Sequence, residues 1–331
     1  MVELIETEFF KKHGFFEIRK IIAGHSGADK FYVKTDSGEE LLAKVSSSLN
    51  LNAYKRKFKY MNRITKAGVP LSRFVEYEKI NKVGNEKIVH FYTWCDGDTV
   101  YRLLKSGKFN AEESYNLGFK AGEILHQMHS VKTKDYPLYI HNQITERLQK
   151  SIEKYQKANY KSPIVECFIP YLESKNVDFL KTRKASYNHG DFHTSNIMYS
   201  EKAGMQIIDC SIYRGDPLTD LAYIIDAARR GVAFYDFANG QIDGYLSGMN
   251  RDSKEFKDFS SDFSFFFALK FLTLFCIFAD HQNYYEEPLA KRKLAKRIKT
   301  EYVALKWFGM RFDLKEFNLS EEVLDKLSSK K

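Results

Sequence analysis

The residues best suited to chemistry lie in one short loop, HGDFHTSN, at residues 189–196. The loop carries a carboxylate, Asp191, and an amide, Asn196, five residues further along the chain. A second carboxylate, Asp209, follows thirteen residues after Asn196, directly behind the apolar run MQII. That run and residues 197–199 are strand candidates, and a hairpin of the two strands would bring Asn196 and Asp209 close together.

These groups fit phosphoryl transfer. An amide oxygen and a carboxylate are hard ligands that suit Mg²⁺, which keeps several waters and binds few protein groups together with phosphates. With Asn196 and Asp209 in that role, Asp191 is free to accept the proton of a hydroxyl nucleophile. Positioning, neutralisation of charge by a metal, and a carboxylate that orients the attacking oxygen are the parts that phosphoryl transfer requires.

The same segment resembles the catalytic segment of kinase-fold phosphotransferases. HGDFHTSN, with IIDCS and GDPLTDLA behind it, is similar to the aminoglycoside phosphotransferase family, which shares its fold with choline and fructosamine kinases. Weaker matches to the family follow in the same order along most of the chain. They are a nucleotide-binding loop at 23–33, a lysine strand at 42–45, an interlobe hinge at 92–97 and a segment at 237–245.

The resemblance implies a role for each residue of the catalytic segment. Asp191 would be the catalytic base that orients the acceptor hydroxyl. Asn196 and Asp209 would be the magnesium ligands. His193 stands where the family often has a histidine, and we assign it a supporting role only.

The resemblance also implies a nucleotide site. Its six predicted residues are Gly24, Ser26, Gly27, Lys44, Thr93 and Cys95. The lysine would contact the α- and β-phosphates, and backbone amides of the glycine loop would cover them, because glycine permits close approach. Backbone groups of the last two residues would hold the edge of the adenine.

One part of the kinase pattern is missing. Kinase-fold enzymes usually pair the strand lysine with a glutamate from the following helix, but no acidic residue lies between Glu40 and Glu76. Lys57 falls near the missing position, and like charges about 4 Å apart cost roughly 4 kcal/mol at an effective dielectric of about 20. Three outcomes are open: Asp209 holds Lys44, the basic helix itself contacts the nucleotide or the product, or the transfer rate is low.

Two regions position these residues. Short strands dominate the first hundred residues, with predicted strands at 18–23, 30–34, 41–45, 74–80 and 87–93 and one helix at 53–67. Helical patterns dominate the rest, at 111–131, 142–159, 163–175 and from 216 to the end, interrupted by a β-rich stretch at 187–208.

With the resemblance, this pattern predicts an α+β, bilobal, protein-kinase-like fold. Residues 1–96 would form a small N-terminal lobe, an antiparallel sheet plus one helix, that binds the nucleotide. Residues 97–331 would form a larger, mainly helical C-terminal lobe with the catalytic loop and the acceptor site.

Two further pairs of residues have structural interpretations. Asp216 can cap a helix whose first residue is Pro217, and Asp220 favours the positive end of that helix dipole. In the family, the position of Asp220 also braces the catalytic loop, so both interpretations stay open. His126 and His129 are assigned to helix packing, because no carboxylate stands at ligand spacing from them.

Composition excludes several classes of protein. The chain has 331 residues, of which 44% are hydrophobic and 29% charged, with 27 Phe and 21 Tyr for a core, so wholesale disorder is excluded. Its four cysteines stand far apart, which fits neither a zinc site nor a disulfide framework, and we expect a reducing, cytoplasmic location. The most apolar window, 263–279, contains Lys270 and is shorter than a membrane span, so it predicts a buried helix and no membrane association.

The net charge of +9 is unevenly distributed. Eight basic residues lie between Glu40 and Glu76, and a second cluster consists of Lys291, Arg292, Lys293, Lys296, Arg297 and Lys299. No aromatic residue interleaves the second cluster as a base-stacking platform would require. We therefore interpret both clusters as solvated helix faces and do not expect a nucleic-acid partner.

The sequence predicts an ATP- and Mg²⁺-dependent phosphotransferase, monomeric or homodimeric, that moves the γ-phosphate to a hydroxyl of a small molecule; GTP stays an open alternative. The resemblance favours an aminoglycoside-type antibiotic, and hence a role in resistance. Such a polycation needs carboxylates, for which the candidates are Asp216, Asp220, Asp226, Asp236 and Asp243.

The alternative is a kinase-like nucleotide-binding regulatory protein with weak or no transfer activity, which the missing glutamate motivates. A protein kinase is disfavoured, because Gly-x-Gly-x-x-Gly and His-Arg-Asp are absent.

Overall fold

A computed structural model of the chain describes residues 8–22, 28–47, 51–80, 87–134, 138–317 and 319. The chain forms two compact units, which are Met1–Asp98 with Met198–Ile212, and Thr99–Ile197 with Tyr213–Lys331. The division at 96/97 drawn from the sequence differs in two places, because residues 97–98 and residues 198–212 belong to the first unit. Strand β9 (Gly204–Ile207) explains the second difference, since the Ile207 N–H donates to the Pro70 carbonyl over 2.8 Å and the Ile207 carbonyl accepts from the Ser72 N–H over 2.8 Å.

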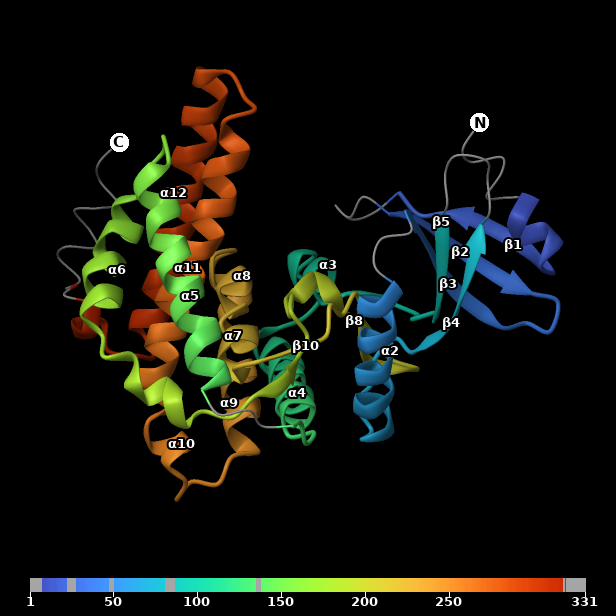
Figure 1. Cartoon of the computed structure of the whole chain (residues 1–331), viewed down its shortest axis with the longest axis horizontal. Helices are drawn as coiled ribbons and strands as arrows, with labels where there is room; N and C mark the ends of the chain where they lie inside the picture. The colour runs from blue at the N-terminus through green and yellow to red at the C-terminus, as the bar shows by residue number, and fades with distance from the viewer. Residues whose placement is uncertain are drawn as a thin grey trace. The chain divides into compact units, whose positions relative to one another are not determined.

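The first unit is built on an antiparallel sheet of five strands in the order β1-β2-β3-β5-β4 (Figure 1). Its strands are Phe15–Lys20 (β1), Asp29–Thr35 (β2), Glu40–Ser47 (β3), Phe74–Ile80 (β4) and Lys87–Thr93 (β5), and helix α2 is Leu51–Lys66. Both β4 and β5 match their predicted ranges. Strand β1 begins three residues before its predicted start, because a register shift between Phe15 and Glu17 breaks the alternation that marks a strand.

Alternation along β3 decides where Lys44 points. Leu41, Ala43 and Val45 are buried in the sheet core with Phe31 and Phe91, so the residues between them face the other side of the sheet. Lys44 therefore stands on the face away from that core. The pairing register sets Lys30 of β2 on one side of it and His90 of β5 on the other.

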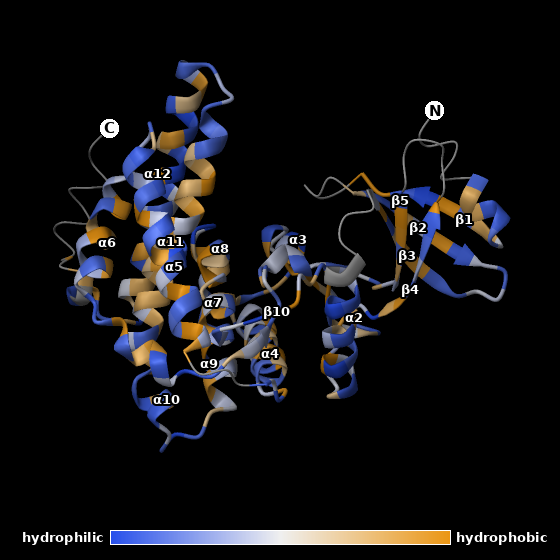
Figure 2. Ribbon diagram, in the orientation of Figure 1, coloured by the Kyte–Doolittle hydropathy of each residue, from blue (hydrophilic) through white to orange (hydrophobic). Residues whose placement is uncertain are grey.

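Ten helices, α3 to α12, make up most of the described part of the second unit (Figure 1). They are Val100–Lys105 (α3), Ala111–His129 (α4), Tyr139–Lys157 (α5), Pro163–Ser174 (α6), Pro217–Leu221 (α7), Ile224–Ala228 (α8), Tyr235–Ser247 (α9), Lys254–Lys257 (α10), Phe259–Gln282 (α11) and Glu287–Gly309 (α12). Polar and apolar residues alternate around α5 in Figure 2, and its buried residues recur at spacings of three or four.

Short strands and 3-10 turns complete the two units. Strands Ser186–Asn188 (β7) and Tyr213–Gly215 (β10) pair antiparallel, and Asp98–Thr99 (β6), Ile197–Ser200 (β8) and β9 form a sheet in the order β6-β8-β9. The 3-10 turns are Val177–Thr182 (η1), Thr194–Asn196 (η2), Val232–Phe234 (η3) and Leu314–Phe317 (η4). The predicted pairing of the strands on either side of residues 201–203 is confirmed.

Helix α11 fills the core of the second unit. By length and composition it could cross a membrane, but 78% of its most apolar window is buried, and it packs on α5, α6 and α7. The sequence-based prediction of a buried helix at 263–279 is therefore confirmed. The continuous helical pattern predicted from residue 216 is divided into α7 to α12, and one break falls at Gly231, whose φ of 106° is left-handed.

Helices α4 and α9 approach each other unusually closely. Gly118 and Gly122 on α4 face Gly240 and Gly244 on α9, and a Cβ built on any of the four would lie 1.9–2.2 Å from a backbone oxygen of the other helix. Only glycine allows two helix backbones to pack at this distance. The spacing of four residues on each helix keeps the glycines on one face.

The first unit contains a buried histidine that should make its stability depend on pH. His90 is 3% exposed, and its ring lies 4.3 Å from the ring of Tyr54. Burial, and then the charges of Lys57 and Lys44, lower the pKa of His90 from 6.5 to about 4. The fold therefore favours the neutral ring.

We expect the free energy of unfolding to fall as the pH drops from 6.5 towards 4, because the unfolded chain takes up a proton that folded His90 does not. The loss should reach about 3 kcal/mol across that window. In His90→Phe, which keeps an aromatic ring, urea denaturation should show a correspondingly smaller loss. The exposed-site variant His281→Gln is the control, and an equal pH dependence in wild type and His90→Phe would contradict the assignment.

Candidate active site

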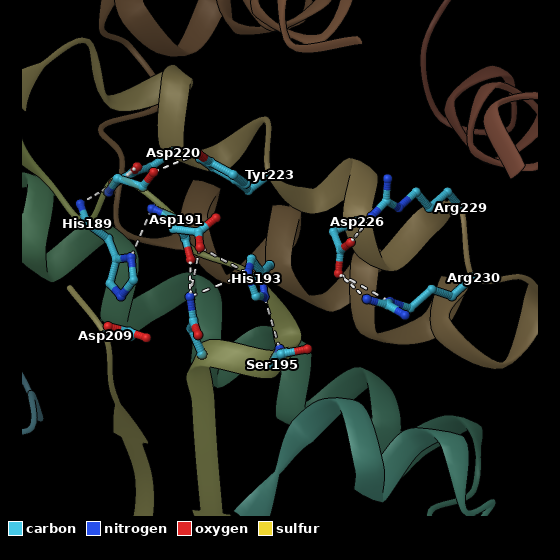
Figure 3. A network of polar contacts seen from close by, with 12 residues as sticks. His189, Asp191, His193, Ser195, Asp209, Asp220, Tyr223, Asp226, Arg229 and Arg230 are labelled. Carbon is cyan, nitrogen blue, oxygen red and sulfur yellow. Dashed lines mark hydrogen bonds and ion pairs between the residues drawn. The ribbon is translucent and has the colours of Figure 1, made fainter. Parts of the chain in front are cut away.

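The predicted catalytic carboxylate stands at the centre of a hydrogen-bonded loop. Asp191 lies between β7 and η2 with its side chain 46% exposed, and its Oδ2 is 3.2 Å from both His193 Nε2 and Asn196 Nδ2 (Figure 3). The Asn196 amide group also donates to the Asp191 carbonyl over 2.9 Å. The structure thus brings together the base and one of the two metal ligands that the sequence predicted.

The hydrogen bonds fix the orientation of two of these side chains. His193 Nδ1 accepts the N–H of Ser195 over 3.2 Å, so the proton of a neutral ring sits on Nε2 and points to Asp191. The NH₂ group of Asn196 donates hydrogen bonds to the carbonyl and the carboxylate of Asp191. The side-chain oxygen of Asn196 is therefore left for another partner. His193 therefore supports Asp191, as predicted, and Asn196 presents a hard oxygen suited to a cation.

A buried carboxylate holds the loop from behind. Asp220 is fully buried and accepts hydrogen bonds from the backbone N–H groups of His189 and Gly190, the second over 2.9 Å. Tyr223 donates to the Gly190 carbonyl over 2.6 Å (Figure 3). Burial alone would raise the pKa of Asp220, but hydrogen bonds from His129 and Gly190 keep it below its ordinary value. Of the two interpretations left open, the structure shows the bracing role.

The support continues into the closely packed helix pair. His129 of α4 lies between Asp220, 3.3 Å from its Nε2, and the Tyr245 hydroxyl of α9, 3.0 Å from its Nδ1. Among the described residues, no group of three or more His, Cys, Asp or Glu could hold a metal ion. The assignment of His129 to helix packing agrees with these contacts. Asp216, as predicted, caps α7 by accepting the N–H of Leu218 over 2.9 Å.

Sequence analysis gave no function to Lys270, which lies behind the same loop. This residue of α11 is 3% exposed, and its Nζ is 3.2 Å from the centre of the Tyr223 ring. Burial, and then Arg147, lower the pKa of Lys270 well below its ordinary value, while Asp220 and Asp191 raise it. The only signal in the sequence was that Lys270 is the single charged residue in the apolar window 263–279.

The second predicted metal ligand lies in the first unit, beside the strand lysine. Asp209 Oδ1 is 2.7 Å from Lys44 Nζ, and its Oδ2 is 3.6 Å from Lys30 Nζ. Burial raises the pKa of Asp209, but Lys44 and Lys30 outweigh it and lower the pKa to about 2. Its φ of 59° lies in the left-handed region that aspartate tolerates better than most residues. Of the three outcomes proposed for the missing glutamate, the structure shows the first, in which Asp209 holds Lys44.

The expected repulsion from the basic helix is also present. Lys57 of α2 and Lys44 of β3 approach the same Tyr92 ring, with their Nζ atoms 5.9 and 5.2 Å from its centre. Burial, and then the charge of Lys44, lower the pKa of Lys57, while Asp209 raises it. Lys57 is therefore held close to Lys44, the predicted phosphate contact.

The predicted hinge offers backbone groups. The Thr93 N–H donates to the Arg73 carbonyl over 2.8 Å, whereas the Thr93 carbonyl accepts from the Ser72 hydroxyl over 2.9 Å and from the Cys95 thiol over 4.0 Å. No acceptor among the described residues takes the Cys95 N–H. Burial raises the pKa of the Cys95 thiol to about 11, so the side chain is neutral. The predicted loop residues Gly24, Ser26 and Gly27 lie outside the described residues.

Comparison with known proteins assigns this set of residues to a family. The profile described as the phosphotransferase enzyme family (APH) matches residues 17–253, which is more than two thirds of the chain. The chain belongs to this phosphotransferase family. The predicted family resemblance is confirmed, and the match covers every residue of the predicted site.

Solved structures show the same fold at low sequence identity. A putative aminoglycoside phosphotransferase from Ralstonia eutropha is 14% identical, with a TM-score of 0.61, over 92% of this chain and 98% of that one. An amicoumacin kinase solved with AMP-PNP and Ca²⁺ is 12% identical, with a TM-score of 0.59, over 92% and 95%. Choline kinase LicA from Streptococcus pneumoniae is 14% identical, with a TM-score of 0.52, over 94% and 99%. These likenesses confirm the predicted α+β, kinase-like fold.

No curated protein matches the chain. The family assignment of the phosphotransferase therefore rests on the profile match, and the solved structures add the fold.

In this phosphotransferase, Asp220→Asn should loosen the catalytic loop. The amide keeps one acceptor oxygen but turns an NH₂ group towards backbone donors, so we expect a loss of about 1–3 kcal/mol in the free energy of unfolding. Urea denaturation measures it. Asp236→Asn, which changes a half-buried carboxylate of α9, is the control and should shift stability by less than about 0.5 kcal/mol. Equal effects of the two variants would show that Asp220 does not brace the loop.

Proposed function

We propose that this phosphotransferase moves the γ-phosphate of ATP, bound with Mg²⁺, to a hydroxyl group of a small molecule. The observation that carries the proposal is the half-exposed Asp191 carboxylate, oriented by His193 and Asn196 in a loop that Asp220 braces. The family match supports phosphoryl transfer, and the amicoumacin kinase bound to AMP-PNP and Ca²⁺ supports the use of a nucleotide and a divalent metal.

Asn196 and Asp209 are the proposed metal ligands. Asn196 has a free side-chain oxygen, and the low pKa of Asp209 keeps that carboxylate ionised at neutral pH. Mg²⁺ binds through one or two protein groups together with phosphates and waters, so two oxygen donors suffice. When bound, the ion neutralises charge on the phosphates.

The proposed reaction is a direct displacement without a covalent enzyme intermediate. The acceptor oxygen forms a bond to the γ-phosphorus, and the bond from that phosphorus to the oxygen shared with the β-phosphate breaks, so ADP leaves with the electron pair. Asp191 orients the hydroxyl and accepts its proton. Catalysis in this scheme comes from positioning and electrostatics.

We further propose that the phosphates of the nucleotide bind to the cations that surround Asp209. Lys44 and Lys30 contact this carboxylate in the first unit, and Lys57 lies near Lys44. A triphosphate supplies the negative charge that the missing helix glutamate would have supplied. Lys57 would then contact the nucleotide, which is the second of the outcomes left open by the sequence.

Lys57→Gln should weaken nucleotide binding by about tenfold, because one charge-assisted contact to phosphate is lost. Calorimetric titration with AMP-PNP and Mg²⁺ measures the dissociation constant. Lys59→Gln changes an exposed lysine of the same helix and should leave the constant unchanged. Tighter binding by Lys57→Gln would mean that Lys57 only repels Lys44 and has no contact with the nucleotide.

The charge of the acceptor can be weighed against the carboxylates of the second unit. The family resemblance favours an aminoglycoside-type antibiotic, which requires unpaired carboxylates. Four of the five predicted carboxylates already have partners: Asp216 pairs with Arg183, Asp220 with the catalytic loop, Asp226 with Arg229 and Arg230, and Asp243 with Arg311. An acceptor screen should therefore include acceptors of every charge.

A regulatory protein without transfer activity is the second candidate. The observation in its favour is that Lys44 closes onto Asp209 in place of a helix glutamate. Release of ADP in the presence of Mg²⁺ and a panel of hydroxyl compounds distinguishes the two candidates, because a regulatory protein binds the nucleotide without consuming it.

Asp191→Ala should lower turnover by about 10² to 10⁴ and leave the affinity for AMP-PNP unchanged, because the base acts on the acceptor and does not bind the nucleotide. The ADP-release assay and a nucleotide titration provide the two measurements. Asp252→Asn, which changes an exposed carboxylate outside the predicted acceptor set, should retain wild-type turnover. More than a tenth of the wild-type activity in Asp191→Ala would reject the role of Asp191.

A further inference from the structure

The second unit contains a strongly basic pocket to which the proposed reaction gives no role. Its volume is about 490 Å³. The described residues that line it come from α3, η3, α11, α12 and the end of α8, and they are Tyr101, Lys105, Arg229, Arg230, Phe234, Phe278, Lys293, Lys296, Arg297 and Thr300. Six of these residues are cations, and none of them is acidic. The basic cluster at 291–299, interpreted from the sequence as a solvated helix face, supplies three of the cations.

The positive charge of this pocket is only partly balanced. Asp226 pairs with Arg229 over 2.6 Å and Arg230 over 2.9 Å, and the buried Glu301 pairs with Arg297 over 2.7 Å. The other three cations, Lys105, Lys293 and Lys296, form no ion pair with any residue that the structure describes. Two carboxylates thus face six cations.

One arginine of the pocket is buried with an unused donor. The Arg297 side chain is 10% exposed, and its Nη2 is buried without a hydrogen-bond partner in the described part of the chain. An unpaired buried charged donor costs free energy, so this arginine is not fully satisfied by Glu301. Burial, and then Arg297 and Arg230, lower the pKa of Arg229, which shows that these cations repel one another.

Aromatic rings hold the arginines in place. The guanidinium carbon of Arg230 lies 4.1 Å from the centre of the Tyr101 ring, and that of Arg297 lies 5.8 Å from the centre of the Phe278 ring. Cations fixed on aromatic faces lose less conformational freedom when they bind a ligand than free surface lysines do. Two arginines of the pocket are therefore partly preorganised for contact with a ligand.

The basic pocket adjoins the catalytic loop. Figure 3 shows Asp226, with Arg229 and Arg230 on it, on the side of the loop where His193 stands. Burial raises the pKa of Asp226, whereas Arg229, Arg230 and His193 lower it, so this carboxylate is close enough to His193 to interact with it. His193 in turn contacts Asp191.

We propose that the basic pocket binds an anionic group of the acceptor, so that the acceptor is a hydroxyl compound carrying a carboxylate or phosphate and not a polycation. This inference rests on the proposed transfer to a hydroxyl. It follows from the unbalanced cations, the unused donor of Arg297 and the position of the pocket next to the catalytic loop. Four of the five carboxylates predicted for a cationic antibiotic are already engaged in the same unit.

The test is an ADP-release screen with four sets of acceptors: hydroxy acids, sugar phosphates, neutral polyols and aminoglycosides. We expect turnover with one of the two anionic sets, and the set that reacts identifies the anionic group.

In the variant Lys293→Gln/Lys296→Gln, KM for that acceptor should rise about tenfold or more with kcat nearly unchanged, because the two charges bind ground and transition states alike. The control variant Arg292→Gln/Lys299→Gln removes two charges from the same helix outside the pocket lining and should keep wild-type constants. Turnover only with cationic or neutral acceptors, or equal KM values in the two variants, would overturn the proposal.

A second measurement does not depend on transfer. Calorimetric titration with inorganic phosphate at constant ionic strength should show binding to wild type and to the Arg292→Gln/Lys299→Gln control, and about tenfold weaker binding to Lys293→Gln/Lys296→Gln. If no acceptor turns over but this difference holds, the proposed function fails and the anion site stands. If an acceptor turns over and phosphate binds all three proteins equally, the function stands and the anion site fails.

Discussion

A single buried carboxylate fixes the geometry of the catalytic loop. Asp220 has no exposure to solvent, and it stays ionised because backbone amides of the loop and His129 donate to it. Moving either the loop or α7 would leave a buried charge without donors, which is among the most costly defects a fold can have. The position of Asp191, one residue beyond these amides, follows from that constraint. The hydroxyl of Tyr223 and the side chains of His193 and Asn196 then set its orientation.

In the first unit, the arrangement of charged side chains around Asp209 depends on the balance between one carboxylate and the lysines beside it. Helix α2 lacks the acidic residue that kinase-fold enzymes place there, and Asp209 is the carboxylate that Lys44 and Lys30 contact, with Lys57 close by. The cations keep Asp209 ionised, and the carboxylate keeps the cations together. This arrangement has an excess of positive charge, which suits a polyphosphate ligand. The second unit repeats the principle in the basic pocket, where two carboxylates face six cations.

Much of this arrangement could be predicted from the sequence, because the signals were local. The spacing of Asp191 and Asn196 and the alternation along β4 and β5 depend on neighbours in the chain, and the structure agrees with them. The start of β1 was wrong because its bulge interrupts the alternation. The basic pocket could not be found, because the chain alone does not show that residues 101, 230 and 297 line one cavity. Lys270 was noticed only as a charge in an apolar run, since its contact with Tyr223 is long-range. The charge of the acceptor also depends on which residues the fold brings together, so the sequence did not determine it.

The glycine contact between α4 and α9 has a consequence for motion. With backbone touching backbone, neither helix can slide or roll along the other without atoms overlapping, so the pair behaves as one rigid plate. His129 links this plate to Asp220, and Asp220 accepts hydrogen bonds from the loop that carries Asp191, so that loop is braced by the helix pair. Any larger motion within the second unit must therefore bend the chain elsewhere and leave the position of Asp191 undisturbed.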